Sequence, residues 1–116
     1  IKKKSSLNKD EIILDIGPET IKNIENIIDN SNTILWNGPA GYFENKNFSV
    51  GTNAIAKKIS ENTINKSLIS VIGGGDTVSA VNKIEKKLIF SHLSTAGGAF
   101  LELLEGKDLP GLSVLK

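Results

Sequence analysis

An apolar segment, a glycine-bearing turn and a helix-patterned segment follow one another repeatedly along this chain, and this order constrains its fold most strongly. The apolar runs at residues 12–14, 33–36, 68–72 and 88–91 are predicted to be strands. Helical patterns follow them, the first beginning at Pro18, the second near Thr52, the third carrying Val78, Val81 and Ile84, and the last running over 99–105. Strands that alternate with helices indicate a three-layer, Rossmann-like α/β fold, with a parallel sheet covered by helices on both faces.

The turns after these strands are expected to share one edge of the sheet. Right-handed crossovers bring the carboxyl ends of parallel strands to the same edge, where open α/β sheets bind their ligands. Four strands are few for such a sheet. Either an edge strand is exposed, which favours self-association, or another part of a longer parent chain completes the sheet. Because the chain has no methionine and opens at Ile1, we expect it to be truncated.

The composition excludes several classes of function. The net charge of +1 gives no electrostatic reason to expect a nucleic-acid or membrane-surface partner. No apolar run is long enough to span a membrane, and the start at Lys2-Lys3-Lys4 lacks the apolar segment of a signal peptide, so a cytoplasmic location is expected. The absence of cysteine excludes disulfides and thiolate chemistry. All 14 basic residues are lysine, so a phosphate site must use lysine, backbone N–H groups or a helix N-terminus.

The stretch Gly73-Gly74-Gly75-Asp76-Thr77 carries the clearest chemical signal. Consecutive glycines allow backbone N–H groups to approach an anion closely, and the helix that follows adds its positive dipole end. Asp76 would then act through a cation such as Mg²⁺, or it would simply cap the helix and stabilise it by about 1 kcal/mol. Neither G-x-x-x-x-G-K-[ST] nor G-x-G-x-x-G is present, which disfavours a dinucleotide-binding oxidoreductase.

Other residues at the expected edge allow a functional and a structural interpretation. Gly97-Gly98 opens the last helix and is a second candidate anion site, or only a tight turn. Asn37, in the Trp36-Asn37-Gly38-Pro39 turn, can bond a ligand or cap its own turn. Glu44 can accept hydrogen bonds from a ribose, or it can be merely solvated. Trp36, at a strand end, is expected to lie in the core.

Several motifs, taken together, resemble the phosphoglycerate kinase family in order and spacing. They are Asp15-Ile16-Gly17-Pro18-Glu19-Thr20, Trp36-Asn37-Gly38-Pro39, Gly41-Tyr42-Phe43-Glu44, Gly51-Thr52, Gly73 to Thr77, Phe90 to Thr95, Leu101 to Gly106 and Leu109-Pro110-Gly111. The resemblance implies a glycolytic enzyme, usually monomeric, that transfers a phosphoryl group between 1,3-bisphosphoglycerate and ADP with Mg²⁺. Residues 1–116 would be the second half of its C-terminal, nucleotide-binding domain, and the N-terminal substrate domain would be absent.

The resemblance also implies a role for individual residues. Glu44 matches the ribose-binding glutamate, and Asn37 and Gly38 match the turn near the phosphate chain. The loop that holds ATP or ADP phosphates corresponds to Gly73, Gly74, Gly75, Asp76 and Thr77, with Asp76 at the metal. Gly97 and Gly98 match the helix start that faces the transferring phosphoryl group. Ala96 stands where the family usually has glycine, and Phe100 where it often has serine.

The same resemblance implies that this piece alone is inactive. The basic domain that binds 3-phosphoglycerate, and the upstream lysines that contact the phosphates, have no counterpart here, and His92 is interpreted as structural. Phosphoryl transfer depends mostly on positioning and charge stabilisation, which these missing cations would supply. An alternative is a stand-alone nucleotide-binding module that catalyses nothing. The coding sequence upstream of Ile1 would distinguish the two.

Overall fold

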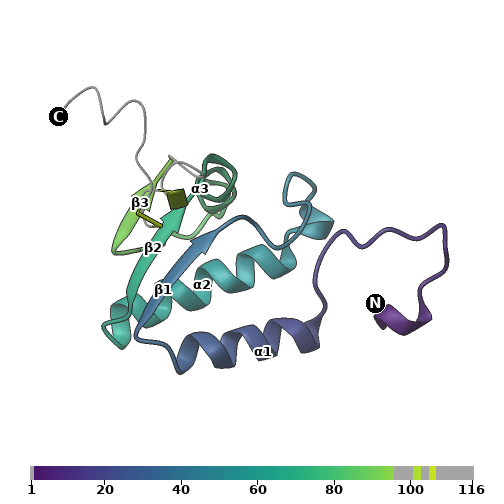
Figure 1. Cartoon of the computed structure of the whole chain (residues 1–116), viewed down its shortest axis with the longest axis horizontal. Helices are drawn as coiled ribbons and strands as arrows, with labels where there is room; N and C mark the ends of the chain where they lie inside the picture. Colours follow the sequence, from purple (N-terminus) through teal and green to yellow (C-terminus); the bar gives the residue numbers. More distant parts are fainter. Residues whose placement is uncertain (1, 96–100, 103–104, 107–116) are drawn as a thin grey trace.

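A computed structural model describes residues 2–95, 101–102 and 105–106 of the chain (Figure 1). Helices and strands alternate along these residues, as the sequence pattern predicts. In chain order the elements are the 3₁₀ turn η1 (Lys4–Ser6), α1 (Pro18–Asp29), β1 (Thr33–Asn37), the 3₁₀ turn η2 (Lys46–Phe48), α2 (Val50–Asn65), β2 (Ile69–Gly73), α3 (Gly75–Asn82) and β3 (His92–Ser94).

The described strands form one parallel sheet in the order β1-β2-β3. Thr33 pairs with Ile69 at one end of the β1–β2 ladder, and Asn37 pairs with Gly73 at the other. Gly73 in turn pairs with Ser94 of β3. The three carboxyl ends therefore lie in register at one edge, which confirms the prediction of a parallel sheet for these strands.

The hydrophobic core lies between this sheet and the first two helices. Proline at the first helical position and isoleucines one or two turns apart give α1 its apolar face, which packs along α2. Ile34 and Trp36 of β1 pack against the core from the sheet. The buried core cluster consists of Ile28, Ile55, Ile59, Leu68 and Ile72. Each buried isoleucine stabilises the fold by about 2 kcal/mol, and this burial fixes the sheet against α2.

The described helices gather on one face of the sheet. The connections β1–α2–β2 and β2–α3–β3 move in the same direction across the sheet, so right-handed crossovers put α2 and α3 on the same side. On the opposite face Leu35 is 44% exposed and Ile69 is 55% exposed. The second helical layer that the sequence pattern predicts is therefore not present among the described residues.

The strand predicted at residues 12–14 does not form. Ile12 is 79% exposed and Ile13 is 62% exposed, and this segment runs as an extended loop toward α1. The carbonyl of Leu14 accepts one hydrogen bond from Tyr42 N, at 2.8 Å, which is a single bond rather than a ladder. An apolar run becomes a strand only where a neighbouring strand can pair with it, and periodicity alone does not report that neighbour.

The last described strand begins later than predicted, at His92 rather than within residues 88–91. Two serine side chains account for the shift. Ser70 N donates to Ser91 Oγ at 2.9 Å, and Ser91 N donates to Ser70 Oγ at 3.0 Å. These side-chain bonds replace the backbone ladder, which then starts one residue later with His92 paired to Val71.

The end of the chain is described only in part. Leu101 and Glu102 are helical, and Glu105 N donates to Leu101 O at 3.0 Å, in agreement with a helix near 99–105. Gly97, Gly98, Ala96 and Phe100 lie outside the described residues. Within the part of the chain that the structure describes, no helix combines the length and the apolarity needed to cross a bilayer.

Asp29, at the end of α1, ties this helix to α2 and gives the fold a pH dependence. Its carboxylate accepts a hydrogen bond from Asn62 Nδ2 at 2.9 Å and lies 3.0 Å from Lys58 Nζ and 3.4 Å from Lys66 Nζ. The hydrogen bond from Asn62, followed by that from Lys58, lowers the pKa of Asp29 from 3.8 to about 2. The folded state therefore stabilises the ionised carboxylate of Asp29 relative to its protonated form, whereas the unfolded chain does not.

Because the pKa is lower in the folded state, the stabilisation by Asp29 is complete above pH 3.8 and is lost as the pH falls toward 2. Asp29→Asn should flatten the dependence of the free energy of unfolding on pH in this window. Urea denaturation at several pH values between 2 and 5 measures it. Glu61→Gln, on the neighbouring helix, is the control, and an unchanged slope in Asp29→Asn would contradict the assignment.

Candidate functional site

Glycine turns follow two of the described strands and meet at one edge of the sheet. β1 ends at Asn37 and β2 ends at Gly73, and these two residues pair directly. Gly74 N then donates to the carbonyl of Ser94, at the end of β3, at 2.9 Å. The structure therefore brings the 37–38 turn and the 73–77 turn together, as the sequence predicts.

Gly74 is the position at which this edge is packed most tightly. Its φ is +95°, a backbone conformation that favours glycine. A Cβ placed there would lie 2.5 Å from Asn37 Oδ1, so the amide of Asn37 sits directly against the glycine backbone. Gly75, by contrast, is exposed and has no atom near its Cβ position. The two turns thus form a narrow junction beside an open surface.

Gly38 is held from both sides. Its N–H donates to Thr77 Oγ1 at 2.7 Å, and its carbonyl accepts from Trp36 Nε1 at 2.6 Å. Thr77 is fully buried in the first turn of α3, so it fixes the 37–38 turn to this helix. Trp36 packs against the core as predicted, but it also positions Gly38 (φ +115°), a role that the sequence interpretation missed.

Asp76 lies in the first turn of α3 and is exposed. The N-cap residue of this helix is Gly74, and no side chain makes a capping hydrogen bond there. The interpretation of Asp76 as the helix cap is therefore wrong. Its carboxylate stands at the positive end of the helix dipole and faces solvent, where it is accessible to a ligand or a cation.

Glu44 lies apart from this junction. It is exposed and lines a hollow of about 610 Å³ between α2 and α3. Lys57 and Lys83 line the same hollow, and Lys83 Nζ is 5.0 Å from the centre of the Phe43 ring. None of the other described residues predicted for the site lines it. The structure therefore groups Asn37, Gly38, Gly73, Gly74, Gly75, Asp76 and Thr77 and sets Glu44 beside a neighbouring hollow.

Two residues that the sequence interpretation gave no role anchor the start of α2 to its surroundings, Thr52 to the loop after Gly38 and Asp15 to the segment before α1. Thr52 Oγ1, fully buried, accepts a hydrogen bond from Ala40 N at 3.0 Å. The Asp15 carboxylate accepts from Gly51 N at 3.1 Å and from Ile16 N at 2.8 Å. A sequence signal was present, because a short polar side chain beside glycine is a common backbone anchor in turns.

The described residues fit a magnesium ion only if a ligand completes its coordination. In the described ranges, no three His, Cys, Asp or Glu side chains come together as a metal site. Mg²⁺ usually keeps several waters and is bound through one or two carboxylates together with phosphate oxygens. Asp76 is exposed and offers one carboxylate, and the exposed backbone of Gly75 beside it leaves room for a phosphate. Asp76 is therefore the described residue that would hold the ion if a nucleotide supplied the phosphate oxygens.

The fold and this edge place the chain in the class of open-sheet α/β proteins, which bind ligands at the carboxyl ends of their strands. Comparison with known families is more specific, since the family model for phosphoglycerate kinase matches residues 1–107. The chain belongs to the phosphoglycerate kinase family, which is a family of phosphotransferases.

Individual relatives agree with this assignment. The phosphoglycerate kinase of Francisella tularensis subsp. novicida is 52% identical over 116 residues, which is 100% of this chain and 29% of the relative. That of Bradyrhizobium diazoefficiens is 50% identical over 107 residues, covering 92% of this chain and 27% of the relative. The chain therefore spans less than a third of the length of these relatives.

Solved structures give the same result. The phosphoglycerate kinase of Coxiella burnetii superposes with a TM-score of 0.81 at 43% identity, covering 95% of this chain and 27% of that chain. The enzyme of Pyrococcus horikoshii gives 0.78 at 33% identity, with coverage of 96% and 27%. The described fold is thus that of a segment of these proteins.

Proposed function

We propose that this chain is the ATP- or ADP-binding part of a phosphoglycerate kinase, from the C-terminal domain of the enzyme. The whole enzyme would transfer a phosphoryl group between 1,3-bisphosphoglycerate and ADP in glycolysis. The proposal rests on one observation above all, which is the junction of Asn37 with Gly74 next to exposed Gly75 and Asp76. Such glycine backbone at a helix start favours anionic ligands.

In this proposal each described residue has a physical task. The backbone at Gly74 and Gly75 approaches the nucleotide phosphates, and Asn37 donates its amide to them. Thr77 and Trp36 hold Gly38 in place through the bonds of 2.7 and 2.6 Å. Glu44 accepts hydrogen bonds from the ribose. Asp76 holds Mg²⁺, which, when bound, neutralises charge on the phosphate oxygens.

Binding of the nucleotide is tested on the chain itself. Addition of Mg·ADP to ¹⁵N-labelled protein should shift the backbone amide signals of Gly38, Gly74 and Asp76, and leave those of α1 unchanged. Mg²⁺ alone is the control and should affect at most the surroundings of Asp76. No shift at about 10 mM Mg·ADP, far above typical substrate affinities, would contradict nucleotide binding.

The isolated chain should not turn over substrate. Phosphoryl transfer needs positioned cations on the transferring group, and the described junction contains no lysine. A coupled assay with 3-phosphoglycerate and Mg·ATP should therefore give the rate of the blank. Metal-dependent turnover that persists through purification and disappears in Asp76→Asn would overturn the view that the chain is only part of an enzyme.

A further inference from the structure

One asparagine of the chain is followed directly by glycine, and this pair is Asn37-Gly38 at the end of β1. The backbone nitrogen of the residue after an asparagine can attack the side-chain amide, and glycine hinders this attack least because it has no Cβ. Both residues are exposed, so water reaches them. The pair is therefore a candidate for deamidation, a covalent change that consumes only water.

The reaction passes through a succinimide ring and involves no oxidant or reductant. The Gly38 nitrogen forms a bond to Cγ of Asn37 while the bond from Cγ to Nδ2 breaks, and the side-chain nitrogen leaves as ammonia with the proton of the Gly38 amide. Water then opens the ring. Opening at Cγ gives aspartate at position 37, whereas opening at the backbone carbonyl carbon gives isoaspartate, in which the chain runs through the side chain.

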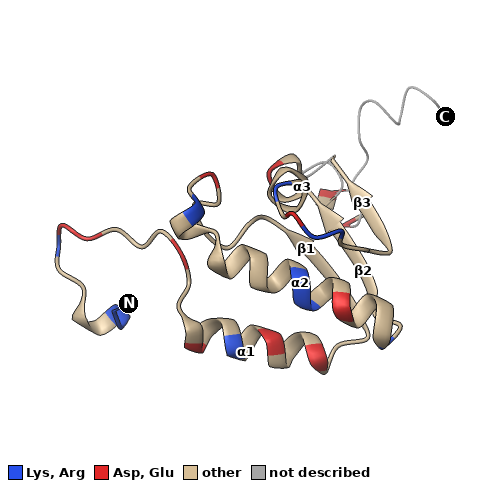
Figure 2. Ribbon diagram, turned by 180° about the vertical axis from the view of Figure 1, so that it is seen from behind, with Lys and Arg blue, Asp and Glu red and all other residues tan. Residues whose placement is uncertain are grey.

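The product would change the charge at this edge of the sheet. From Asn30 to Phe43 the sequence contains no charged residue, and Figure 2 shows β1 free of charge along its length. Deamidation would place a carboxylate beside the backbone of Gly74, two residues before Asp76. A carboxylate repels a neighbouring carboxylate and any bound anion. The reaction would therefore make this edge less favourable to an anionic ligand.

The folded structure holds Gly38 against this reaction. Its N–H donates to Thr77 Oγ1 at 2.7 Å, and its carbonyl accepts from Trp36 Nε1 at 2.6 Å. Ring closure requires the Gly38 nitrogen to lose its proton and the Gly38 peptide to turn, and these changes break both bonds. Because Thr77 is fully buried, leaving its hydroxyl without this partner is costly.

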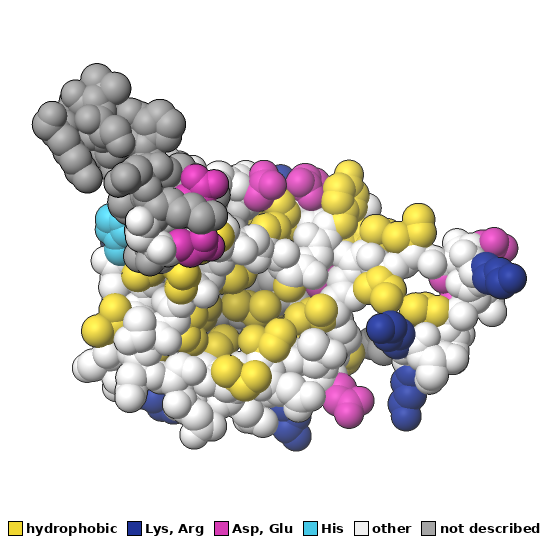
Figure 3. Space-filling view, in the orientation of Figure 1, with side chains coloured by type: hydrophobic (Ala, Val, Ile, Leu, Met, Phe, Trp, Pro, Cys, Tyr) yellow, Lys and Arg dark blue, Asp and Glu magenta, His cyan; other side chains and the backbone are white. Residues whose placement is uncertain are grey.

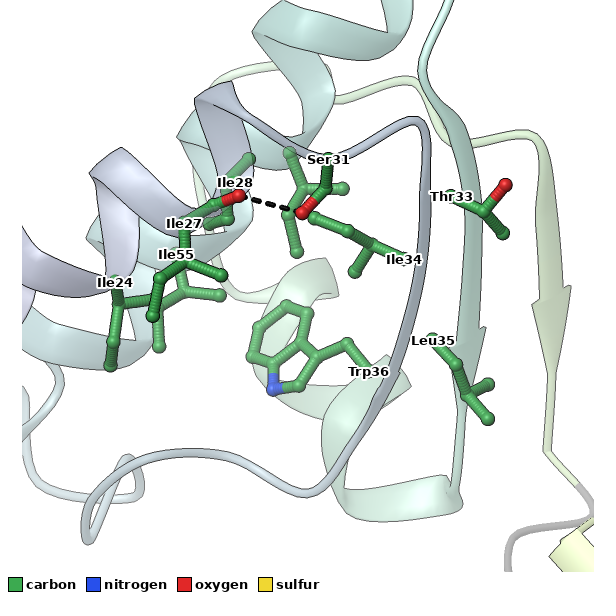
Figure 4. Close-up of a pocket in the computed structure, with 10 residues that line it drawn as sticks. Ile24, Ile27, Ile28, Ser31, Thr33, Ile34, Leu35, Trp36 and Ile55 are labelled. Carbon is green, nitrogen blue, oxygen red and sulfur yellow. Dashed lines mark hydrogen bonds between the residues drawn. The ribbon is translucent and has the colours of Figure 1, made fainter.

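Trp36 is itself fixed by apolar packing. Figure 3 shows hydrophobic side chains gathered in a hollow between β1 and α1. The ring of Trp36 points into this hollow from β1, and Ile24 and Ile27 line it from α1 (Figure 4). The position of the ring determines the position of Nε1. The bond to the Gly38 carbonyl therefore depends on core packing rather than on a freely rotating side chain.

Asn37 is held as well. It is the last residue of the β1–β2 ladder and pairs with Gly73. Its Oδ1 lies only 2.5 Å from the Cβ position of Gly74, so the side-chain amide is packed against the 73–77 turn. The attack on Cγ requires this amide to rotate. Deamidation therefore requires the 37–38 turn to open locally from the 73–77 turn.

We propose that Asn37 is a latent deamidation site, which the bond to Thr77 and the packing against Gly74 keep unreacted in the folded chain. When the two turns separate, the Gly38 nitrogen attacks and position 37 acquires a negative charge. A loss of nucleotide affinity on deamidation rests on the proposed function, because it assumes that phosphates bind at this edge. The modification itself does not depend on the nucleotide.

Mass spectrometry of peptides from the purified chain, incubated in mildly alkaline buffer, measures the modification, and L-isoaspartyl methyltransferase labels its isoaspartate form. In urea the peptide with Asn37 should deamidate before that of any other asparagine. In the folded chain the same peptide should react at least about tenfold more slowly, since only the locally open form reacts. Equal rates in the two states, or an earlier reaction of another asparagine in urea, would overturn the proposal.

Thr77→Val tests the anchor, because it keeps the shape of the side chain and removes the acceptor for Gly38 N–H. The rate in the folded chain should rise about fivefold, which corresponds to the loss of one hydrogen bond worth about 1 kcal/mol. Thr77→Ser keeps the hydroxyl and should stay close to the original rate. Thr63→Val is the matched control, since it removes a threonine hydroxyl that lies 2.7 Å from Ser70 Oγ. Equal rates in the two valine variants would overturn the role of Thr77.

The effect on the ligand is measured separately. Ion exchange separates the deamidated chain, and calorimetry compares its affinity for Mg·ADP with that of the unmodified chain. Weaker binding by the deamidated chain is expected, and equal binding by both would refute the effect of the new charge. If neither form binds Mg·ADP, the proposed function fails, while the deamidation rates still decide whether Asn37 is protected by the fold.

Discussion

Gly74→Ala is expected to lower the free energy of unfolding by about 2 kcal/mol or more and to displace Asn37. The backbone there has a φ of +95°, and this region disfavours a residue with a Cβ by about 1–2 kcal/mol. The new methyl would also lie 2.5 Å from Asn37 Oδ1, well inside contact distance. The side chain of Asn37 must therefore rotate away, and the junction of the two turns opens.

Gly75→Ala is the matched control, one residue further along the chain. No atom lies within 4 Å of its Cβ position, and Gly75 is the first residue of α3. Alanine is the better helix former, so this variant should be neutral or slightly more stable. Urea denaturation gives both stabilities, and the ¹⁵N signal of the Asn37 side-chain amide reports its position. Equal stability of the two variants would show that the described junction is not tightly packed.

The strand–turn–helix order was sufficient to predict the parallel sheet and its shared edge. Parallel strands cannot be joined by short hairpins and need a longer crossover connection, which is usually a helix. The helix-patterned segments between the predicted strands supply these connections. Asn37, Gly74 and Asp76 were then expected at the same edge because each follows a strand. The structure confirms that they are neighbours in the fold, while their ligand stays a proposal.

The strands predicted at residues 12–14 and 88–91 are misplaced because the pattern of apolar residues carries no information about tertiary neighbours. Residues 12–14 are as apolar as β1, but no described strand lies beside them. At Ser91 the side chain, rather than the backbone, pairs with β2, which shortens the ladder from its beginning. Both outcomes depend on tertiary neighbours, and these are not encoded within a short window of sequence.

The residues that position the site were missed for a related reason. Trp36, Asp15 and Thr52 act through hydrogen bonds to backbone groups that are close in space. The bond from Gly38 N to Thr77 Oγ1 likewise joins residues 39 positions apart. A turn motif suggests which residues meet a ligand, and a polar side chain beside glycine suggests an anchor, but the backbone group that Asp15 or Thr52 bonds is known only once the fold brings the two together.

Asp76→Asn is expected to weaken the binding of Mg·ADP by about tenfold or more, equivalent to about 1.4 kcal/mol, and to leave metal-free ADP bound as well or better. Hard cations prefer carboxylate oxygens, so the loss of the charge removes the partner that Asp76 offers to Mg²⁺. Without the metal, the same change removes repulsion between a carboxylate and the phosphates. The comparison is between the two forms of the nucleotide, measured by calorimetry on the chain and the variant.

Because Asp76 lies on the surface, Asp76→Asn changes the charge at the site without disturbing the fold. It is exposed, it makes no cap for α3, and asparagine has nearly the same shape, so the variant should fold and lose at most about 1 kcal/mol of charge–dipole stabilisation. Ser79→Ala, on the exposed side of the same helix, is the control and should alter neither affinity. If Asp76→Asn changed both affinities equally, Asp76 would act only through the field at the helix start, and the assignment of Mg²⁺ to this carboxylate would be wrong.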